Sequence, residues 1–385
     1  MTWSTVALGE VATVERHGMQ PADIARDAWY VGLEHIEPGG RKVTRQQAAE
    51  AELKSAKFQF GPEHILYGKL RPYLAKIATP DFSGVCSTDI LPIRPGGLID
   101  RRYLTHYLRQ GEVVDLANSR ATGANLPRLS PAELSRLPVP LPSLDEQRRI
   151  AAILDQADAI RAKRRQVLKG LDALVVAQVN TLLDGALGGP TTTLGEVADM
   201  RAGRNLVADD LEAESEYRVL KISSVTSGTF RPAETKPLPW GYIPPREHMV
   251  VDGDLLMSRA NTTELVGASA LASSVGANVA LPDKIWRFEW RDPRSDSHFY
   301  QALLSAPISR RQISQAASGT GGSMKNISKE KLKGVRIPWV EFETQKNFGD
   351  VVRSIRERQH RVAAALKQDD ALFSSLQFRA FKGEL

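Results

Sequence analysis

The side chains that most resemble a catalytic group lie in the segment PDKIWRFEWR, which begins at Pro282. A Pro-Asp pair followed by Glu-x-Lys would indicate a metal-dependent nuclease, in which carboxylates hold divalent ions. Here the acids are closely spaced, Arg291 stands where the lysine would be, and the corresponding segment STDILPIRP has no second acid. The spacing therefore argues against a nuclease site.

Other patterns of catalytic or metal-binding residues are also missing. The seven histidines show no paired metal spacing, no G-x-S-x-G elbow occurs, and GTGGSMK at Gly319 lacks the spacing of a phosphate loop. The tetrapeptide of amino-methyltransferases, Asn-Pro-Pro-aromatic or Asp-Pro-Pro-aromatic, is absent. The single cysteine, Cys86, excludes an intramolecular disulfide and a multi-thiolate zinc site. We expect no catalytic residue, no metal site and no enzyme activity of the chain by itself.

Composition narrows the class of protein. With 385 residues and 42% hydrophobic content, the chain suits two globular domains and an extended element. A formal charge of +6 favours a polyanionic partner, because neutralised phosphates release counterions. We see no secretory signal and no apolar run suited to a membrane span. Together with the lone cysteine, this predicts a soluble protein of the reducing cytoplasm.

Two copies of one pattern run along the chain. LGEVA occurs at Leu8 and at Leu194, 186 residues apart, whereas PLPSLDEQ and IPWVEFETQ place Gln147 and Gln345 198 residues apart. The second copy is therefore 12 residues longer, and the extra length lies inside it. From the proline segment onward, corresponding residues of the two copies stay 198 positions apart. The two copies therefore match in length after the proline segment and differ in length before it.

Within each copy we expect corresponding strands and loops. YVGLEHI from Tyr30 pairs with YRVLKIS from Tyr217, and HILYGKLR pairs with GDLLMSRAN; each resembles a strand. A Gly-containing loop then precedes Ser130 or Ser328, which we predict to be the N-cap of a short helix that leads into the proline segment.

A long amphipathic helix is predicted after each proline segment, over 145–187 and 343–385. Its acidic start suits the positive end of the helix dipole, and the 39 residues from Asp145 to Leu183 would span roughly 58 Å. Polar residues interrupt the apolar stripe at Arg161, Arg164, Gln178 and Asp369, where they would set register or meet solvent. The alternative to a pair of spacer helices is a helical hairpin inside one core. The stripe residues that we expect to form the helix core and to bind partners are Ile150, Leu154, Leu168, Leu171, Val175, Phe348, Val352, Ile355, Leu366 and Phe373.

PLPSLDEQRRIAAILDQADAI, IPWVEFETQKNFGDVVRSI and the terminal FKGEL resemble the specificity (S) subunit of type I restriction-modification systems. The resemblance implies an α+β fold: two α/β target-recognition domains, at 1–144 and 188–342, separated by two long antiparallel helices that form a coiled coil with a pseudo-twofold internal repeat. It also implies a non-catalytic subunit that reads an asymmetric, bipartite DNA target. Its partners would be double-stranded DNA, two copies of the methyltransferase (M) subunit and the nuclease-translocase (R) subunit. S-adenosylmethionine, ATP and magnesium would belong to those partners.

Base readout requires forked or amide side chains on loops that can enter a groove. In each copy such residues lie in the loop after the second strand and in the Gly-containing loop, with weaker candidates near Arg201. For each of them an ordinary surface residue is the alternative. The candidate DNA contacts are Lys69, Arg71, Tyr73, Lys76, Asn125, Arg128, Arg204, Asn205, Ser258, Arg259, Asn261, Thr262, Ser323, Lys325 and Asn326.

Two other functions compete with this interpretation. A stand-alone coiled-coil DNA-binding regulator would need no catalytic partner. A methyltransferase or nuclease acting alone would show turnover as the purified chain.

Overall fold

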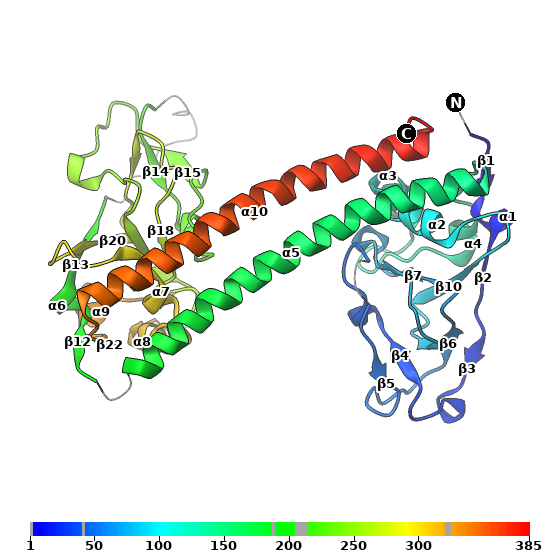
Figure 1. The fold of residues 1–385 in the computed structure, drawn as a ribbon, viewed down its shortest axis with the longest axis horizontal. Helices are drawn as coiled ribbons and strands as arrows, with labels where there is room; N and C mark the ends of the chain where they lie inside the picture. The colour runs from blue at the N-terminus through cyan, green and yellow to red at the C-terminus, as the bar shows by residue number, and fades with distance from the viewer. Residues whose placement is uncertain (1–2, 41–42, 187–188, 205–214, 320–324) are drawn as a thin grey trace. The chain divides into compact units, whose positions relative to one another are not determined.

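The computed structural model describes residues 3–40, 43–186, 189–204, 215–319 and 325–385 (Figure 1). The chain divides into two compact units. Unit 1 comprises Met1–Arg165 and Ala364–Leu385, and unit 2 comprises Gln166–Ala363. Each unit therefore contains part of both long helices. Mixed helix and sheet in each unit fit the predicted α+β class.

Unit 1 contains a four-stranded and a five-stranded sheet. In the first, the strand order is β2 (Ala12–Val14), β10 (Ile90–Pro95), β7 (Ile65–Gly68) and β8 (Ile77–Ala78). In the second, it is β3 (Gly18–Met19), β6 (Lys57–Phe60), β9 (Gly84–Cys86), β4 (Trp29–Val31) and β5 (Gln46–Gln47). The helices of the unit are α1 (Leu8–Val11), α2 (Arg101–Leu108), α3 (Gly111–Ser119) and α4 (Pro131–Ser135), together with its parts of α5 (Leu144–Ala186) and α10 (Phe342–Lys382).

Unit 2 has a four-stranded sheet of the same order of connection, β13 (Ala198–Ala202), β20 (Ile285–Trp290), β16 (Leu255–Ser258) and β18 (Ser269–Leu271). Its second sheet has three strands, β15 (Thr235–Pro237), β14 (Arg218–Leu220) and β19 (Val279–Ala280). A two-stranded ribbon joins β17 (Ala260–Asn261) to β21 (Lys325–Asn326). The helices are α6 (Leu194–Val197), α7 (Ser297–Ser305), α8 (Pro307–Ala316) and α9 (Lys329–Lys333).

Several local predictions are confirmed. The Ser130 hydroxyl accepts a hydrogen bond from the Glu133 amide at 3.1 Å, and Ser328 caps α9 in the same way. The proline segment is extended: β11 (Pro138–Pro140) pairs with β1 (Thr5–Ala7), and β22 (Arg336–Pro338) pairs with β12 (Thr191–Thr193). Cys86 is fully buried in the core.

The strand predicted from Tyr30 is wrong over its second half. β4 ends at Val31, and a 3₁₀ turn follows over Leu33–His35. The Gly32 amide donates to His35 Nδ1 at 2.8 Å and closes the turn. In unit 2, β14 likewise ends at Leu220 before a turn over Ile222–Ser224. A local side-chain hydrogen bond competes here with the apolar pattern that predicted a longer strand.

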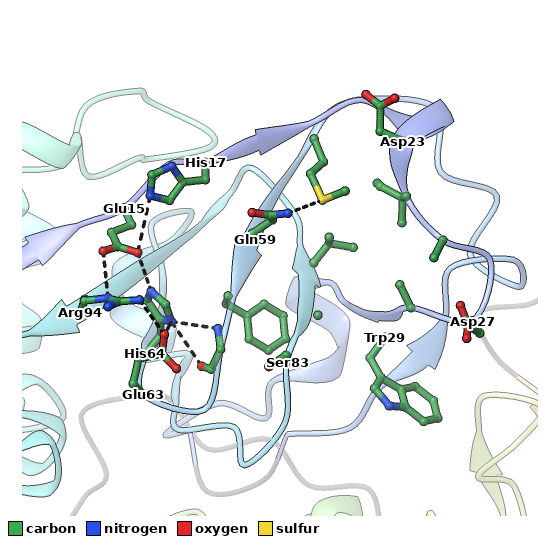
Figure 2. Close-up of a pocket in the computed structure, with 18 residues that line it drawn as sticks. Glu15, His17, Asp23, Asp27, Trp29, Gln59, Glu63, His64, Ser83 and Arg94 are labelled. Atoms are coloured by element: carbon green, nitrogen blue, oxygen red, sulfur yellow. Dashed lines mark hydrogen bonds and ion pairs between the residues drawn. The ribbon is translucent and has the colours of Figure 1, made fainter.

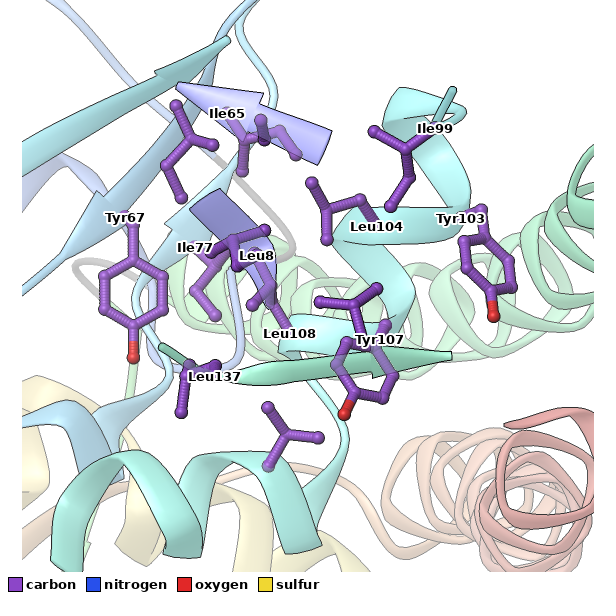
Figure 3. Close-up of a cluster of buried hydrophobic side chains, with 14 of the residues drawn as sticks. Leu8, Ile65, Tyr67, Ile77, Ile99, Tyr103, Leu104, Tyr107, Leu108 and Leu137 are labelled. Carbon is purple, nitrogen blue, oxygen red and sulfur yellow. The ribbon is translucent and has the colours of Figure 1, made fainter. Parts of the chain in front are cut away.

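The core of unit 1 lies between its four-stranded sheet and α2. Figure 3 shows Leu104 and Leu108 of α2 on the side of Ile65 and Ile77 of the sheet, whereas Tyr103 lies on the other side of α2. Two segments of the long helices complete this core. Ile150 and Leu154 of α5 are fully buried in it, and Phe381 of α10 lies with its ring centroid 5.2 Å from that of Tyr103.

The long helices are α5 (Leu144–Ala186) and α10 (Phe342–Lys382). Helix α5 is consistent with the predicted spacer helix. A buried glutamine anchors each start. Gln147 Nε2 donates to Leu98 O at 3.1 Å and to Pro142 O at 2.9 Å, while its Oε1 accepts from the Asp100 amide at 2.8 Å. Gln345 donates to Val340 O at 2.7 Å and accepts from the Asp296 amide at 3.5 Å. The repeated glutamine thus fastens each long helix to the N-cap residue of α2 or α7.

The predicted stripe residues lie on the less exposed side of the long helices. Val175, Val352 and Ile355 are buried in unit 2, where half-buried Phe348 packs on the cluster around Val179. In unit 1, half-buried Phe373 packs on the core. The three remaining stripe residues are half-buried: Leu168, Leu171 and Leu366.

Charged residues that interrupt the stripe pair with one another in unit 1. Arg161 is 6% exposed, and its Nε donates to Asp370 at 2.6 Å, with its guanidinium 4.0 Å from the ring centroid of Phe373. Arg164 donates to Asp369 at 2.5 Å. In unit 2, Gln359 donates to Asp172 at 2.7 Å. These contacts join α5 to α10 within each unit.

Candidate nucleic-acid interface

Two loops meet in unit 1 at the end of β7. The Lys69 amide donates to Asp89 O at 2.9 Å, and the Leu129 amide donates to Lys69 O at 2.9 Å. The Arg71 amide donates to Pro127 O at 2.7 Å. The loop 69–76 is therefore held against the loop 122–128. We call these two loops the first recognition surface; they bring together Lys69, Arg71 and Arg128.

One acid lies among these cations. Asp89 Oδ1 accepts from Arg128 Nε at 3.2 Å and lies 3.8 Å from Lys69 Nζ. Sequence reasoning missed Asp89 as a member of the site. The only sign of it was an acid just before the apolar strand ILPIRP, and strand register is needed to place it beside Lys69.

The backbone of the first recognition surface is strained at two points. Arg71 and Ala75 have φ of 52° and 46°, in the left-handed region that residues with a Cβ adopt at a cost of about 1 kcal/mol each. They flank the 3₁₀ turn Pro72–Leu74, on which Tyr73 is 50% exposed. Strain of this kind is concentrated at functional loops.

The other candidates of unit 1 differ in their surroundings. Lys76 Nζ donates to Leu33 O at 2.6 Å and so has a partner inside the unit. Asn125 is exposed at the tip of the loop 122–128.

In unit 2 the corresponding loops meet at the end of β16. The Arg259 amide donates to Lys284 O at 3.0 Å, and the Ile327 amide donates to Arg259 O at 3.0 Å. In the ribbon that follows, Asn261 lies opposite Lys325, and Ala260 opposite Asn326. We call 259–262 with 325–326 the second recognition surface.

Arg259 has an unused donor there. Its Nε is buried without a hydrogen-bond partner among the described residues, and its guanidinium lies 6.0 Å from the ring centroid of Trp286. Helix α8 holds the neighbouring loop, because Arg310 donates to Glu264 O at 2.8 Å and Ser314 to Thr263 O at 2.9 Å. Burial lowers the pKa of Arg310.

The remaining candidates of unit 2 are scattered. Ser258 is fully buried, and its hydroxyl donates to Ala260 O at 3.2 Å. Thr262 and Arg204 are exposed. Asn205 and Ser323 lie outside the described residues. Arg201 is bound to Glu289 at 2.5 and 3.1 Å.

A polar pocket of unit 1 contains a histidine and carboxylates (Figure 2). His64 Nδ1 accepts from the Gly61 amide at 2.9 Å, so its Nε2 carries the proton and donates to Glu15 at 2.9 Å. Arg94 bridges Glu15 and Glu63 at 2.9 and 2.7 Å. The hydrogen bond from His64 lowers the pKa of Glu15, with a smaller contribution from the charge of Arg94, against the opposing effect of burial. Because every member has a partner, the cluster fastens β7 to β2 and β10.

The same strand positions carry the opposite charges in unit 2. Ile93 lies opposite Val14 in unit 1, and Phe288 lies opposite Met200 in unit 2. In this register Arg201 stands where Glu15 does, and Glu289 where Arg94 does. Glu15 and Arg94 of unit 1 are both replaced in unit 2, by Arg201 and Glu289. Each unit therefore keeps an ion pair at these positions, with acid and base exchanged.

No group of three metal-ligating side chains occurs among the described residues. Nor does any described helix combine the length and apolarity needed to cross a bilayer.

Comparison with known proteins shows what the chain is similar to. Residues 1–170 match the family described as Type I restriction modification DNA specificity domain. The chain is 30% identical over 217 residues to the Type I restriction enzyme EcoDI specificity subunit of Escherichia coli, covering 54% of this chain and 47% of that one. It is 26% identical over 325 residues to the EcoKI specificity subunit of Escherichia coli K12, covering 76% and 67%. The matched segment thus spans about half of the first relative and two thirds of the second.

Solved structures share the fold at low identity. The S subunit of a type I restriction-modification system from M. genitalium aligns with a TM-score of 0.62 and 13% identity, over 98% of this chain and 96% of that one. A chain solved in work on complex assembly and conformational transition of the type I R-M system gives 0.56 and 18%, over 100% and 98%. Residues 1–170 are therefore similar to type I restriction modification DNA specificity domains, and the curated relatives of the chain are specificity subunits of type I restriction enzymes.

Proposed function

We propose that this chain is the DNA-reading specificity subunit of a type I restriction-modification complex. The observation that carries the proposal is the pair of recognition surfaces. Each unit holds basic side chains on two loops that the same backbone hydrogen bonds bring together, at the end of β7 in one unit and of β16 in the other. Arginine, lysine and asparagine on such loops can contact base edges and phosphates.

The two surfaces differ in side chains, and this favours an asymmetric, bipartite target. The first carries Lys69, Arg71 and Arg128, whereas the second carries Arg259, Asn261 and Lys325 at or near the corresponding positions. Arginine suits guanine and asparagine suits adenine. Because the loops of the two units share their backbone hydrogen bonds but carry different hydrogen-bond donors, we expect each unit to bind a different half of the target.

The long helices suit a spacer built as an antiparallel coiled coil with pseudo-twofold symmetry. Within unit 1, Arg161 contacts Asp370 and Arg164 contacts Asp369; within unit 2, Asp172 contacts Gln359. Numbers rise along α5 as they fall along α10, as antiparallel helices require. The helix length would then set the unread gap between half-sites.

Exposed apolar residues at heptad spacing support the docking of two methyltransferase subunits. Ile160, Val167 and Leu174 of α5 are 46, 48 and 43% exposed. The residues 198 positions after Ile153 and Leu174 are Val351 and Leu372 of α10, which are 45 and 56% exposed. At the two positions between them, 198 after Ile160 and Val167, α10 carries Arg358 and Ala365, so the two helices share the ends of this seam but not its middle. The matched ends favour two copies of one partner. S-adenosylmethionine, ATP and magnesium would be held by the methyltransferase and nuclease-translocase subunits, and this chain would be non-catalytic.

The function is tested by mapping methylated adenines in host DNA with and without this gene. We expect one split sequence to lose its methylation when the gene is deleted. An unchanged methylation map would contradict the proposal. Turnover by the purified chain with DNA and labelled S-adenosylmethionine would favour a methyltransferase acting alone.

Partner docking is tested by the substitution Leu174→Glu. A charge on the seam should reduce co-purification of the methyltransferase at least tenfold, because a carboxylate would be buried in an apolar interface. Val176→Glu is the matched control, since Val176 is 53% exposed on the same helix but lies off the seam. Equal loss in both variants, or no partner with the unchanged chain, would favour the stand-alone regulator.

A further inference from the structure

Asp89 of unit 1 and Lys284 of unit 2 stand at corresponding backbone positions and carry opposite charges. Ile90 lies opposite Gly68 in unit 1, and Ile285 lies opposite Ser258 in unit 2. The residue just before each strand, Asp89 or Lys284, accepts a hydrogen bond on its carbonyl from the amide of Lys69 or Arg259, at 2.9 and 3.0 Å. The register and the hydrogen bonds agree, so the difference between the two sites is in the side chain.

In the first recognition surface the carboxylate neutralises two cations. Asp89 Oδ1 lies 3.2 Å from Arg128 Nε and 3.8 Å from Lys69 Nζ, and the Asp89 side chain is 27% exposed. A phosphate that approached these two cations would have to displace the carboxylate or accept its repulsion. The ion pair uses only Nε of Arg128, so the two terminal nitrogens point beyond the carboxylate.

In the second recognition surface Arg259 corresponds to Lys69, Asn326 stands at the position of Arg128, and the cations present are uncompensated among the described residues. Within the described part of the chain, neither Arg259, Lys284 nor the adjacent Asp283 takes part in an ion pair, and Arg259 Nε has no hydrogen-bond partner. Lys284 adds a charge where unit 1 has an acid. This surface is therefore the better suited of the two to bind phosphate.

The exchange at 89 and 284 differs from the exchange elsewhere in the sheets. Glu15 and Arg94 are replaced together by Arg201 and Glu289, which preserves an ion pair that joins two strands. Around Asp89 and Lys284 no ion pair is kept: Lys69 corresponds to the basic Arg259, whereas the neutral Asn326 stands at the position of Arg128. The ion pair that joins two strands is thus kept with its signs reversed, whereas the pair between Asp89 and Arg128 has no counterpart among the described residues of unit 2.

We propose that Asp89 is a specificity-determining residue of the first recognition surface. It keeps Lys69 and Arg128 from binding phosphates and directs them to base edges, whereas Lys284 makes the second surface rely more on phosphate contacts. The inference rests on the proposed DNA-reading function and deepens it.

The experiment uses the full chain with the partner subunits that co-purify. The unchanged protein first selects its target from randomised duplexes, and affinity is then measured for that target and for an unrelated duplex over a range of salt. Asp89→Asn should raise affinity for the unrelated duplex several-fold and steepen the log–log salt dependence by about 1 to 2 units, since each phosphate contact contributes about 0.9. Base preference should weaken in one half of the target. Lys284→Gln should make the salt dependence shallower by about 1 unit.

Asp145→Asn is the matched control. Asp145 is 95% exposed and pairs with Arg148, so its substitution also frees one arginine and makes the same change in net charge, at the start of α5. Equal effects of Asp89→Asn and Asp145→Asn, or weakened preference in both halves, would overturn the inference. A switch of preferred base with an unchanged salt dependence would overturn it too, because Asp89 would then contact a base itself. If the unchanged protein selects no sequence, the proposed function itself fails.

Discussion

Single ionic side chains attach the long helices to the cores. Asp155 of α5 accepts a hydrogen bond from His106 Nε2 at 2.7 Å and one from Arg102 at 3.2 Å. The hydrogen bond from His106 lowers the pKa of Asp155, with further help from the charges of His106 and Arg102 and against the opposing effect of burial. The carboxylate therefore binds α5 to α2 in its ionised form.

This pKa shift predicts an acid-sensitive contribution to stability. Because the pKa of Asp155 is lower in the folded state than its usual value of 3.8, the contribution is present above that value and is lost as pH falls through the folded-state pKa. Asp155→Asn should lower the melting temperature near neutral pH, with a loss of under about 1 kcal/mol because the side chain is partly exposed. Thermal melts from pH 7 to pH 3 should show the two proteins converging below about pH 4. A constant difference across that range would show that charge is not the cause.

At the scale of elements, the repeated glutamine explains why an extended proline segment changes abruptly into a helix. Gln147 is fully buried and makes three hydrogen bonds, to the proline segment, to the turn before α2 and to the N-cap residue of α2. Gln345 makes two of the corresponding hydrogen bonds, one of them 3.5 Å long, and a further one with the Tyr300 side chain. One side chain thus sets where the helix begins and which helix it packs against.

Gln147→Leu should lower the free energy of unfolding by about 2 to 3 kcal/mol, because it leaves buried backbone groups without partners. Gln345→Leu should cost less, since its hydrogen bond from the Asp296 amide is 3.5 Å long, against 2.8 Å for the bond from the Asp100 amide to Gln147. Urea melts measure both, with the exposed Gln156→Leu on the same helix as the control. A smaller loss for Gln147→Leu than for Gln345→Leu would refute this ranking.

Particular elements show what sequence can predict here. The apolar stripes predicted both long helices because the pattern extends over many turns, and Ser130 and Ser328 were predicted as caps from local chemistry. The turn after β4 was missed, since the hydrogen bond between Gly32 and His35 is invisible to periodicity. Asp89 was missed because its role depends on strand register, which brings residues 20 positions apart into contact.

On the scale of the whole molecule, the last part of α10 belongs to unit 1 although it is far away in sequence. Phe381 packs against Tyr103 and Tyr107 with ring centroids 5.2 and 5.1 Å apart, and buried Gln377 donates to His106 O at 2.8 Å. Leu182 and Leu183 of α5, 198 positions before Ala380 and Phe381, pack on the core of unit 2. Each unit is thus completed by the far end of a long helix.

Phe381→Ala should lower the stability of unit 1 by about 3 kcal/mol, because a buried aromatic side chain is removed from between two others. Phe378→Ala is the control, since Phe378 is 39% exposed on the same turn of α10. Hydrogen exchange localises the change. The amides of α2 should exchange faster in Phe381→Ala, and their exchange rates should stay the same in Phe378→Ala. Faster exchange confined to unit 2 would contradict the assignment.

The packing of Phe381 has a consequence for how the protein is made. A ribosome releases the residues of the first sheet long before residues 364–385, so the aromatic face of α2 stays open to water, chaperones and proteases during most of synthesis. A premature stop or a frameshift late in the gene would therefore damage the part of the protein encoded at its beginning.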